Sequence, residues 1–140
     1  MRKLTCVMLA AALLLISLVA ACGSSAPDSS LSGGILATFE VQGESYRIFI
    51  TNPSTIDQVL ALQAGNGSPI PNGKLVRGQV SYNQPWSWHI DSEDISMVDF
   101  TVEIYDGLPS HVENDLDYWL DTVGRFAPWQ AELTSVEDFR

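Results

Sequence analysis

The sequence predicts a single small α+β domain, with a largely antiparallel sheet and two covering helices, behind an export segment and a flexible linker. Three observations support this prediction. Apolar and polar residues alternate in several short runs, as they do in half-buried strands. Two other runs carry apolar residues at helical spacing, and each begins at a capping residue and ends at a glycine. A chain of 140 residues with 46% hydrophobic and 17% charged side chains also suits one folded domain.

Residues 35–42 and 46–51 are expected to form the first two strands, because apolar and polar side chains alternate in both runs. Gly43-Glu44, with glycine first, is expected to form the two-residue hairpin turn between them. The positions expected to face the core are the apolar ones: Ile35, Ala37, Phe39 and Val41 in the first strand, and Tyr46, Ile48 and Ile50 in the second.

Two segments carry helix signals at both ends. The Asn-Pro pair at 52–53 opens the first helix, since asparagine caps a helix and proline suits its first turn. Gly65 ends this helix. The second helix is expected to begin at Ser110, with Glu113 completing a capping box, and to stop at Gly124.

The remaining strands follow from alternation and from turn residues. Residues 75–82 are expected to form a third strand, with a bulge at Gly78, and residues 86–90 a short fourth one. Residues 98–105 alternate most regularly and give the clearest strand pattern of the chain. Residues 130–136 supply a last strand, and Trp129 just before it is expected to cap the far end of the core.

The N-terminal residues 1–21 are predicted to be a lipoprotein signal peptide. Two basic residues precede an apolar run over residues 4–21, and Cys22 follows small residues. The string Leu18-Val-Ala-Ala-Cys22 resembles the bacterial lipoprotein box, in which the cysteine becomes the first residue and its thiol carries acyl chains through diacylglycerol. An uncleaved membrane anchor is the alternative, since the run approaches the roughly 20 residues that span a bilayer.

Either arrangement tethers the domain outside the cytoplasm, in the bacterial cell envelope. The lipoprotein resemblance implies the outer membrane or the outer cell surface, because Gly23 rather than aspartate follows the cysteine. Residues 22–34 form the lipidated cysteine and a Gly/Ser linker, and residues 35–140 form the domain. Cys6 is removed with the signal, so the mature domain is expected to have no disulfide and no cysteine-based zinc site.

The mature chain is strongly acidic. Without the signal peptide it keeps 5 basic and 17 acidic side chains, a net charge of −12. Nucleic acids and anionic lipid surfaces attract clustered lysine and arginine, so this balance argues against both as partners.

The densest group of chemically distinctive residues lies at 86–91, Trp-Ser-Trp-His-Ile-Asp. On a strand, Ser87, His89 and Asp91 share one face and the two tryptophans share the other. Side chains on one face project in parallel instead of converging end to end, so a serine-hydrolase triad is disfavoured. We expect Trp86, Trp88, His89 and Asp91 to be candidate binding residues, with packing of the tryptophans in the core as the alternative.

Carboxylates are concentrated between residues 91 and 121, in an extracytoplasmic domain where calcium is a natural ligand. Asp99, Glu103 and Asp106 are weak candidates for metal ligands. Their spacing does not match a calcium-binding loop, and we expect no cofactor, with calcium as the alternative. An acidic face that gives solubility explains the same residues.

Three stretches, residues 82–91, 103–113 and 123–129, resemble the family of the N-terminal domain of "binding protein seventy-four". The resemblance covers most of residues 35–137 and implies a small secreted domain, with no enzymatic activity attached to it. Relatives often carry cysteines, implying a disulfide, where this chain has Tyr105 and Ala127.

These observations together predict a lipid-anchored, extracytoplasmic, non-catalytic binding module that engages a protein or a glycan. A metal-dependent or hydrolytic enzyme that uses the region of His89 and Asp91 is one alternative. A calcium-stabilised structural module is the other.

Overall fold

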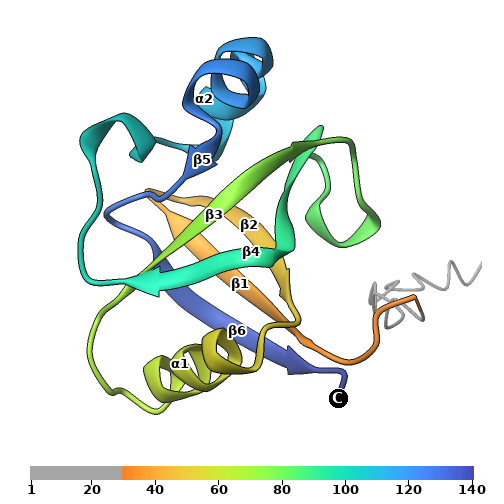
Figure 1. Cartoon of the computed structure of the whole chain (residues 1–140), viewed down its shortest axis with the longest axis vertical. Coiled ribbons are helices and arrows are strands. Elements are labelled where there is room, and N and C mark those ends of the chain that lie inside the picture. Colours follow the sequence, from red (N-terminus) through yellow and green to blue (C-terminus); the bar gives the residue numbers. More distant parts are fainter. Residues whose placement is uncertain (1–29) are drawn as a thin grey trace, which may run out of the picture.

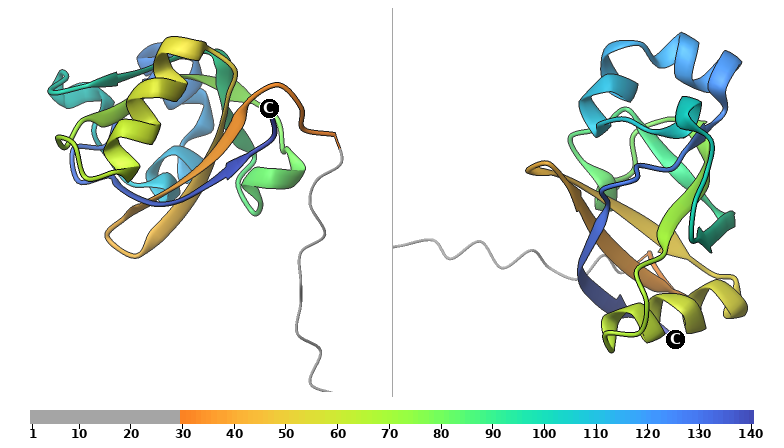
Figure 2. Two further views of the ribbon diagram at one scale, coloured as in Figure 1. Left: turned by 90° about the horizontal axis from the view of Figure 1, so that it is seen from below. Right: turned by 90° about the vertical axis from the view of Figure 1, so that its left-hand side faces the viewer.

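The computed structural model describes residues 30–140; the predicted signal peptide, Cys22 and the linker up to residue 29 lie outside the described residues. Two antiparallel sheets of three strands each pack against one another, in the orders β2-β1-β6 and β4-β3-β5. Helix α1 lies at one end of the sheets and α2 at the opposite end (Figures 1 and 2). The predicted α+β class is confirmed, with two small sheets in place of one larger one.

The first sheet is built on a hairpin of β1 (Ile35–Val41) and β2 (Glu44–Ile50). Val41 pairs with Glu44, so the turn residues are Gln42 and Gly43, one position before the predicted turn. Both have positive φ, 50° and 86°, which is the conformation of a tight hairpin turn whose twist matches the strands. The predicted apolar positions of both strands are buried.

Strand β6 (Glu132–Asp138) completes this sheet by pairing with the other side of β1. Figure 2 shows the two strands running side by side, although almost a hundred residues separate them along the chain. Backbone pairing continues into the end of the predicted linker, where the Gly33 N–H donates to the Phe139 carbonyl at 2.8 Å. The folded domain therefore begins just before Ile35.

The second sheet consists of β3 (Ile70–Arg77), β4 (Trp88–Val98) and the two-residue β5 (Arg125–Phe126). Strand β3 begins five residues before the predicted third strand and ends before Gly78. Strand β4 continues well beyond residue 90, where the predicted fourth strand stopped. The register shift in this sheet lies between Gly73 and Leu75, so the predicted bulge at Gly78 is not where the strand is irregular.

The strand predicted over residues 98–105 is wrong. Strand β4 ends at Val98, and residues 103–105 form a short 3₁₀ turn. The alternating apolar residues of this stretch face solvent, with Phe100 86%, Val102 56% and Ile104 51% exposed. Alternation marks a strand only where a neighbouring strand supplies the hydrogen bonds, and within residues 30–140 no strand pairs with residues 99–105.

Helix α1 (Pro53–Gln63) follows its sequence signals closely. The Asn52 side-chain oxygen accepts hydrogen bonds from the N–H groups of Ser54 and Thr55, so the predicted cap is confirmed. The Thr55 hydroxyl is buried and donates to the Ile95 carbonyl at 2.9 Å, which fixes the helix against β4.

Helix α2 (Pro109–Asn114) is shorter than predicted and is followed by a π-helical turn over Tyr118–Val123. Gly124 ends the turn with a φ of 76°, as predicted. The predicted capping box is wrong, because each of its residues bonds to another part of the fold. The N–H and hydroxyl of Ser110 donate to the Glu44 carboxylate at 2.8 and 2.7 Å. The Glu113 carboxylate accepts from the N–H and hydroxyl of Ser87, both at 2.8 Å.

Aromatic rings fill the space between the two sheets. Tyr46 of β2, Trp88 of β4 and Phe126 of β5 form a triangle, with ring centroids 5.3 to 6.0 Å apart. Trp119 from the π-helical turn packs edge-on against Phe126 at 5.8 Å. Burial raises the pKa of Tyr46 well above its ordinary value, because the apolar surroundings disfavour the phenolate.

The buried side chain of Asn83, in the 3₁₀ turn Ser81–Asn83, connects the same two sheets. Its oxygen accepts a hydrogen bond from the Arg47 N–H of β2 at 2.7 Å, and its nitrogen donates to the Trp88 carbonyl of β4 at 2.9 Å. Asn83 is only 1% exposed, so water cannot replace either partner.

The positions at which relatives are expected to carry cysteines are neighbours in this fold. The Ala127 N–H donates to the Tyr105 carbonyl at 2.9 Å, so a backbone hydrogen bond joins the two segments here. Their proximity agrees with the disulfide that the resemblance implied for relatives.

We predict that Asn83→Ala lowers the free energy of unfolding by about 2–4 kcal/mol, because the Arg47 N–H and the Trp88 carbonyl lose a buried partner. Urea unfolding followed by circular dichroism measures the change. Asn66→Ala, in the exposed loop after α1, is the matched control and should shift stability by no more than about 0.5 kcal/mol. Equal effects of the two substitutions would contradict the role given to Asn83.

Candidate functional site

The two tryptophans of the predicted binding motif lie mainly in the interior. Trp88 is 0% exposed, so it is a core residue and does not present its ring to a ligand. Trp86 is partly buried; its ring stacks on Trp88 with centroids 6.1 Å apart, and its indole N–H donates to the Ser45 carbonyl at 2.9 Å. Of the two alternatives, core packing therefore describes Trp88.

The polar residues of the same motif do not act on one another. The Ser87 hydroxyl donates to Glu113, as described above, and His89 Nδ1 lies 2.9 Å from the Gly78 carbonyl. An Asp91 carboxylate oxygen accepts from the Glu93 N–H at 3.0 Å. Each polar group thus bonds to a different backbone or side-chain partner. These contacts hold β4 and the residue before it in place.

The three weak metal candidates are spread along an irregular segment. Asp99 follows the end of β4, Glu103 opens the 3₁₀ turn, and Asp106 accepts a hydrogen bond from the Trp129 N–H at 2.8 Å. Within residues 30–140, no three His, Cys, Asp or Glu side chains lie close enough together to hold a metal ion. In the same part of the chain, no helix is long and apolar enough to cross a membrane.

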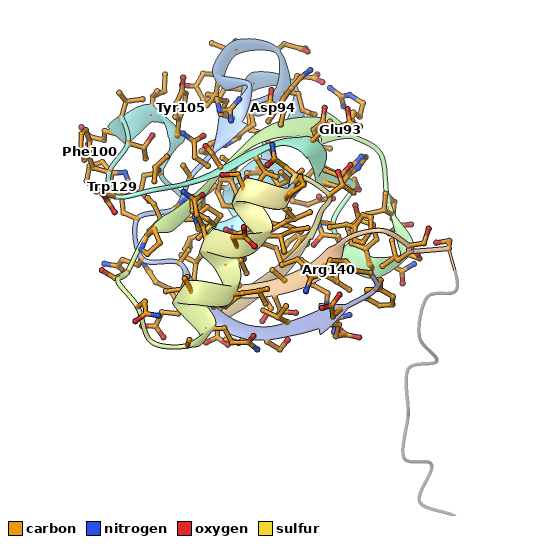
Figure 3. The ribbon with its side chains drawn as sticks, turned by 60° about the horizontal axis from the view of Figure 1, so that its bottom comes forward. Glu93, Asp94, Phe100, Tyr105, Trp129 and Arg140 are labelled. Carbon is orange, nitrogen blue, oxygen red and sulfur yellow. The ribbon has the colours of Figure 1, made fainter. Side chains whose placement is uncertain are left out.

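A different pair of aromatic residues is presented to solvent. Phe100 is 86% and Trp129 48% exposed, and Figure 3 shows them beside each other at one edge of the domain. Both line a hollow of about 420 Å³, and its other lining residues are Ser68, Ile70, Asp99 and Thr101. An exposed tryptophan next to an exposed phenylalanine is a common anchor for a binding partner, because rigid rings lose little entropy on contact.

The backbone around Trp129 is fixed although its ring is exposed. Pro128 is buried, the Trp129 N–H is held by Asp106, and the Ala131 N–H donates to the Pro128 carbonyl at 3.2 Å. Trp129 does not cap the core as expected. The turn formed by residues 128–131 instead places the Trp129 ring beside the segment that follows β4.

Further hollows adjoin this one along the segment Ser68–Ile70. One of about 540 Å³ is lined by Trp129, Gln130 and Glu132 on one side and by Glu40 and Gln42 on the other. Another of about 380 Å³ lies between the end of α1 and the start of β6. A fourth, of about 430 Å³, is also lined by Phe100, together with Met97 and Asp99. We call Phe100, Trp129 and these four hollows the aromatic surface.

The aromatic surface carries negative charge. Glu40, Asp99 and Glu132 line its hollows, and none of the lining residues is lysine, arginine or histidine. Arg140 lies elsewhere and is engaged with Asp138, where its hydrogen bond lowers the pKa of that carboxyl from 3.8 to about 2.

Comparison with known proteins adds one finding. A family model for the N-terminal domain of "binding protein seventy-four" matches residues 35–140, which include every strand and helix described above. This is the family that the sequence motifs resemble. No curated protein and no solved structure matches the chain.

Proposed function

The chain belongs to the family of the "binding protein seventy-four" N-terminal domain, and we propose that it is a lipid-anchored, extracytoplasmic binding module of the bacterial cell envelope. It engages its partner without catalysis, through the aromatic surface. The observation that carries this proposal is the pair of exposed rings, Phe100 and Trp129, set on a rigid scaffold beside contiguous hollows.

Two features support binding over catalysis. The residue types of a hydrolase triad are present at Ser87, His89 and Asp91, but each holds its own separate partner. An exposed apolar surface on a small acidic domain has a cost in solubility, and such surfaces are a common mark of interaction sites. Phe100, at 86% exposure, buries little of its ring in the fold, which fits a role outside folding.

The position of the tether supports the same proposal. Residues 30–34 enter the domain on the side opposite to Phe100 and Trp129 (Figure 3). A lipid attached at Cys22 and followed by the Gly/Ser linker would therefore join the domain at a place that leaves the aromatic surface uncovered. A partner in the envelope or on another molecule can reach it there.

We predict that the aromatic surface contacts a partner in the living cell. A photo-crosslinking phenylalanine analogue placed at Phe100 should give a covalent adduct on irradiation, seen as a shifted band on an immunoblot. The same analogue at Tyr118, which is 44% exposed in the π-helical turn, is the matched control and should give no such band. Adducts of the same size from both positions, or from neither, would rule out a partner specific to this surface.

We also predict that Cys22 carries the membrane anchor. In detergent phase separation, the wild-type protein should enter the detergent phase, and intact mass should show a chain that begins at a lipid-modified Cys22. Cys22→Ser should abolish the modification, whereas Cys6→Ser should leave it unchanged, because Cys6 is removed with the signal peptide. A mature product that retains Met1 would contradict this part of the proposal.

A further inference from the structure

We propose that the occupant of the aromatic surface is an extended, positively charged polypeptide segment, recognised through its arginine and lysine side chains. This inference rests on the proposed function, since it names the class of partner for the same surface. It follows from the charge, the rings and the shape of the surface.

The first step concerns unbalanced charge. Three carboxylates, Glu40, Asp99 and Glu132, line the hollows around the two rings. Within residues 30–140 none of the three forms an ion pair. Like charges gathered on one surface repel each other, so a cation brought to it gains attraction and relieves that repulsion.

The second step is that the domain's own basic side chains lie elsewhere. Lys74 lines none of the four hollows. Each arginine in the described part of the chain pairs with a carboxylate away from the hollows: Arg47 with Glu137, Arg77 with Asp117, Arg125 with Asp94, and Arg140 with Asp138. Within residues 30–140, no basic side chain is therefore placed to complement the aromatic surface, and the proposal assigns that cation to another molecule.

The third step concerns the rings. A guanidinium or ammonium group over the face of tryptophan or phenylalanine is attracted by the ring electrons. Arginine combines this stacking with a planar fork that pairs with carboxylates. Trp129 and Asp99 line one hollow and Trp129 and Glu132 the next, so a single arginine side chain has a ring and a carboxylate within one hollow in both places.

The fourth step concerns shape. The surface is a row of open hollows on either side of Ser68–Ile70, and none is a deep enclosed cavity of the kind that buries most of a small molecule. A row of this kind suits successive side chains of an extended segment.

The experiment uses the full lipoprotein in micelles of a non-ionic detergent. A fluorescein-labelled peptide of alternating arginine and glycine is titrated, and its anisotropy gives the dissociation constant. A glutamate–glycine peptide and a neutral N-acetylglucosamine oligomer are the comparison probes. We expect the arginine peptide alone to bind, and to bind more weakly as salt rises from about 0.05 M to about 0.5 M.

Variants separate this surface from the general acidity of the chain. Trp129→Ala should weaken binding about fivefold and the pair Asp99→Asn with Glu132→Gln about tenfold. The matched control is Asp115→Asn with Asp121→Asn, which removes the same charge from exposed residues that line none of the hollows. This control and Tyr118→Ala should change binding less than about twofold.

Two results would overturn the inference. Equal losses from the two charge pairs would mean that the peptide follows net charge and not this surface. Binding of the N-acetylglucosamine oligomer, lost in Trp129→Ala, together with no binding of the arginine peptide, would identify a glycan as the partner. That second result would leave the proposed function intact, whereas the crosslinking experiment at Phe100 tests the surface itself.

Discussion

The contact between β2 and β4 is the constraint on which the rest of the domain depends. Each sheet has only three strands, and residues 30–140 contain no cysteine, so no disulfide connects them. At this contact Asn83 satisfies one backbone group of each strand, and the rings of Tyr46 and Trp88 meet beside Phe126. Large aromatic side chains supply the buried apolar area that a small domain without covalent crosslinks requires.

The packing of β2 against β4 also explains which residues of the chain have a structural role. Trp88 is buried in the core, and the side chains of Ser87 and His89 form hydrogen bonds within the fold. Beyond Val98 the chain leaves the sheet, and Phe100 is exposed because no strand pairs with it in the part of the chain that the structure describes. The surface proposed to bind a partner is thus built from segments that follow the strands, on a scaffold that the core keeps rigid.

The sequence pattern predicted those elements that depend on residues close together in the chain. Alternation identified the buried faces of β1 and β2, and the asparagine cap fixed the start of α1. Prediction failed where a distant partner decides the outcome. Ser110 and Glu113 have the spacing of a capping box, but each bonds to a residue far away in sequence.

The candidate site was harder to predict for the same reason. The residue types at 86–91 and at 98–105 are equally clear in the sequence, but which stretch is buried depends on which one has a neighbouring strand. Trp88 has β3 beside it, where Arg77 is its partner, and Phe100 has none among residues 30–140. Fluorine NMR of the protein labelled with 5-fluorotryptophan tests the resulting account directly, with Trp129→Phe, Trp86→Phe and Trp119→Phe used to assign the four tryptophan signals. On changing from H₂O to D₂O, the Trp129 signal should shift clearly and the Trp88 signal should not. A solvent shift of Trp88 equal to that of Trp129 would contradict the account.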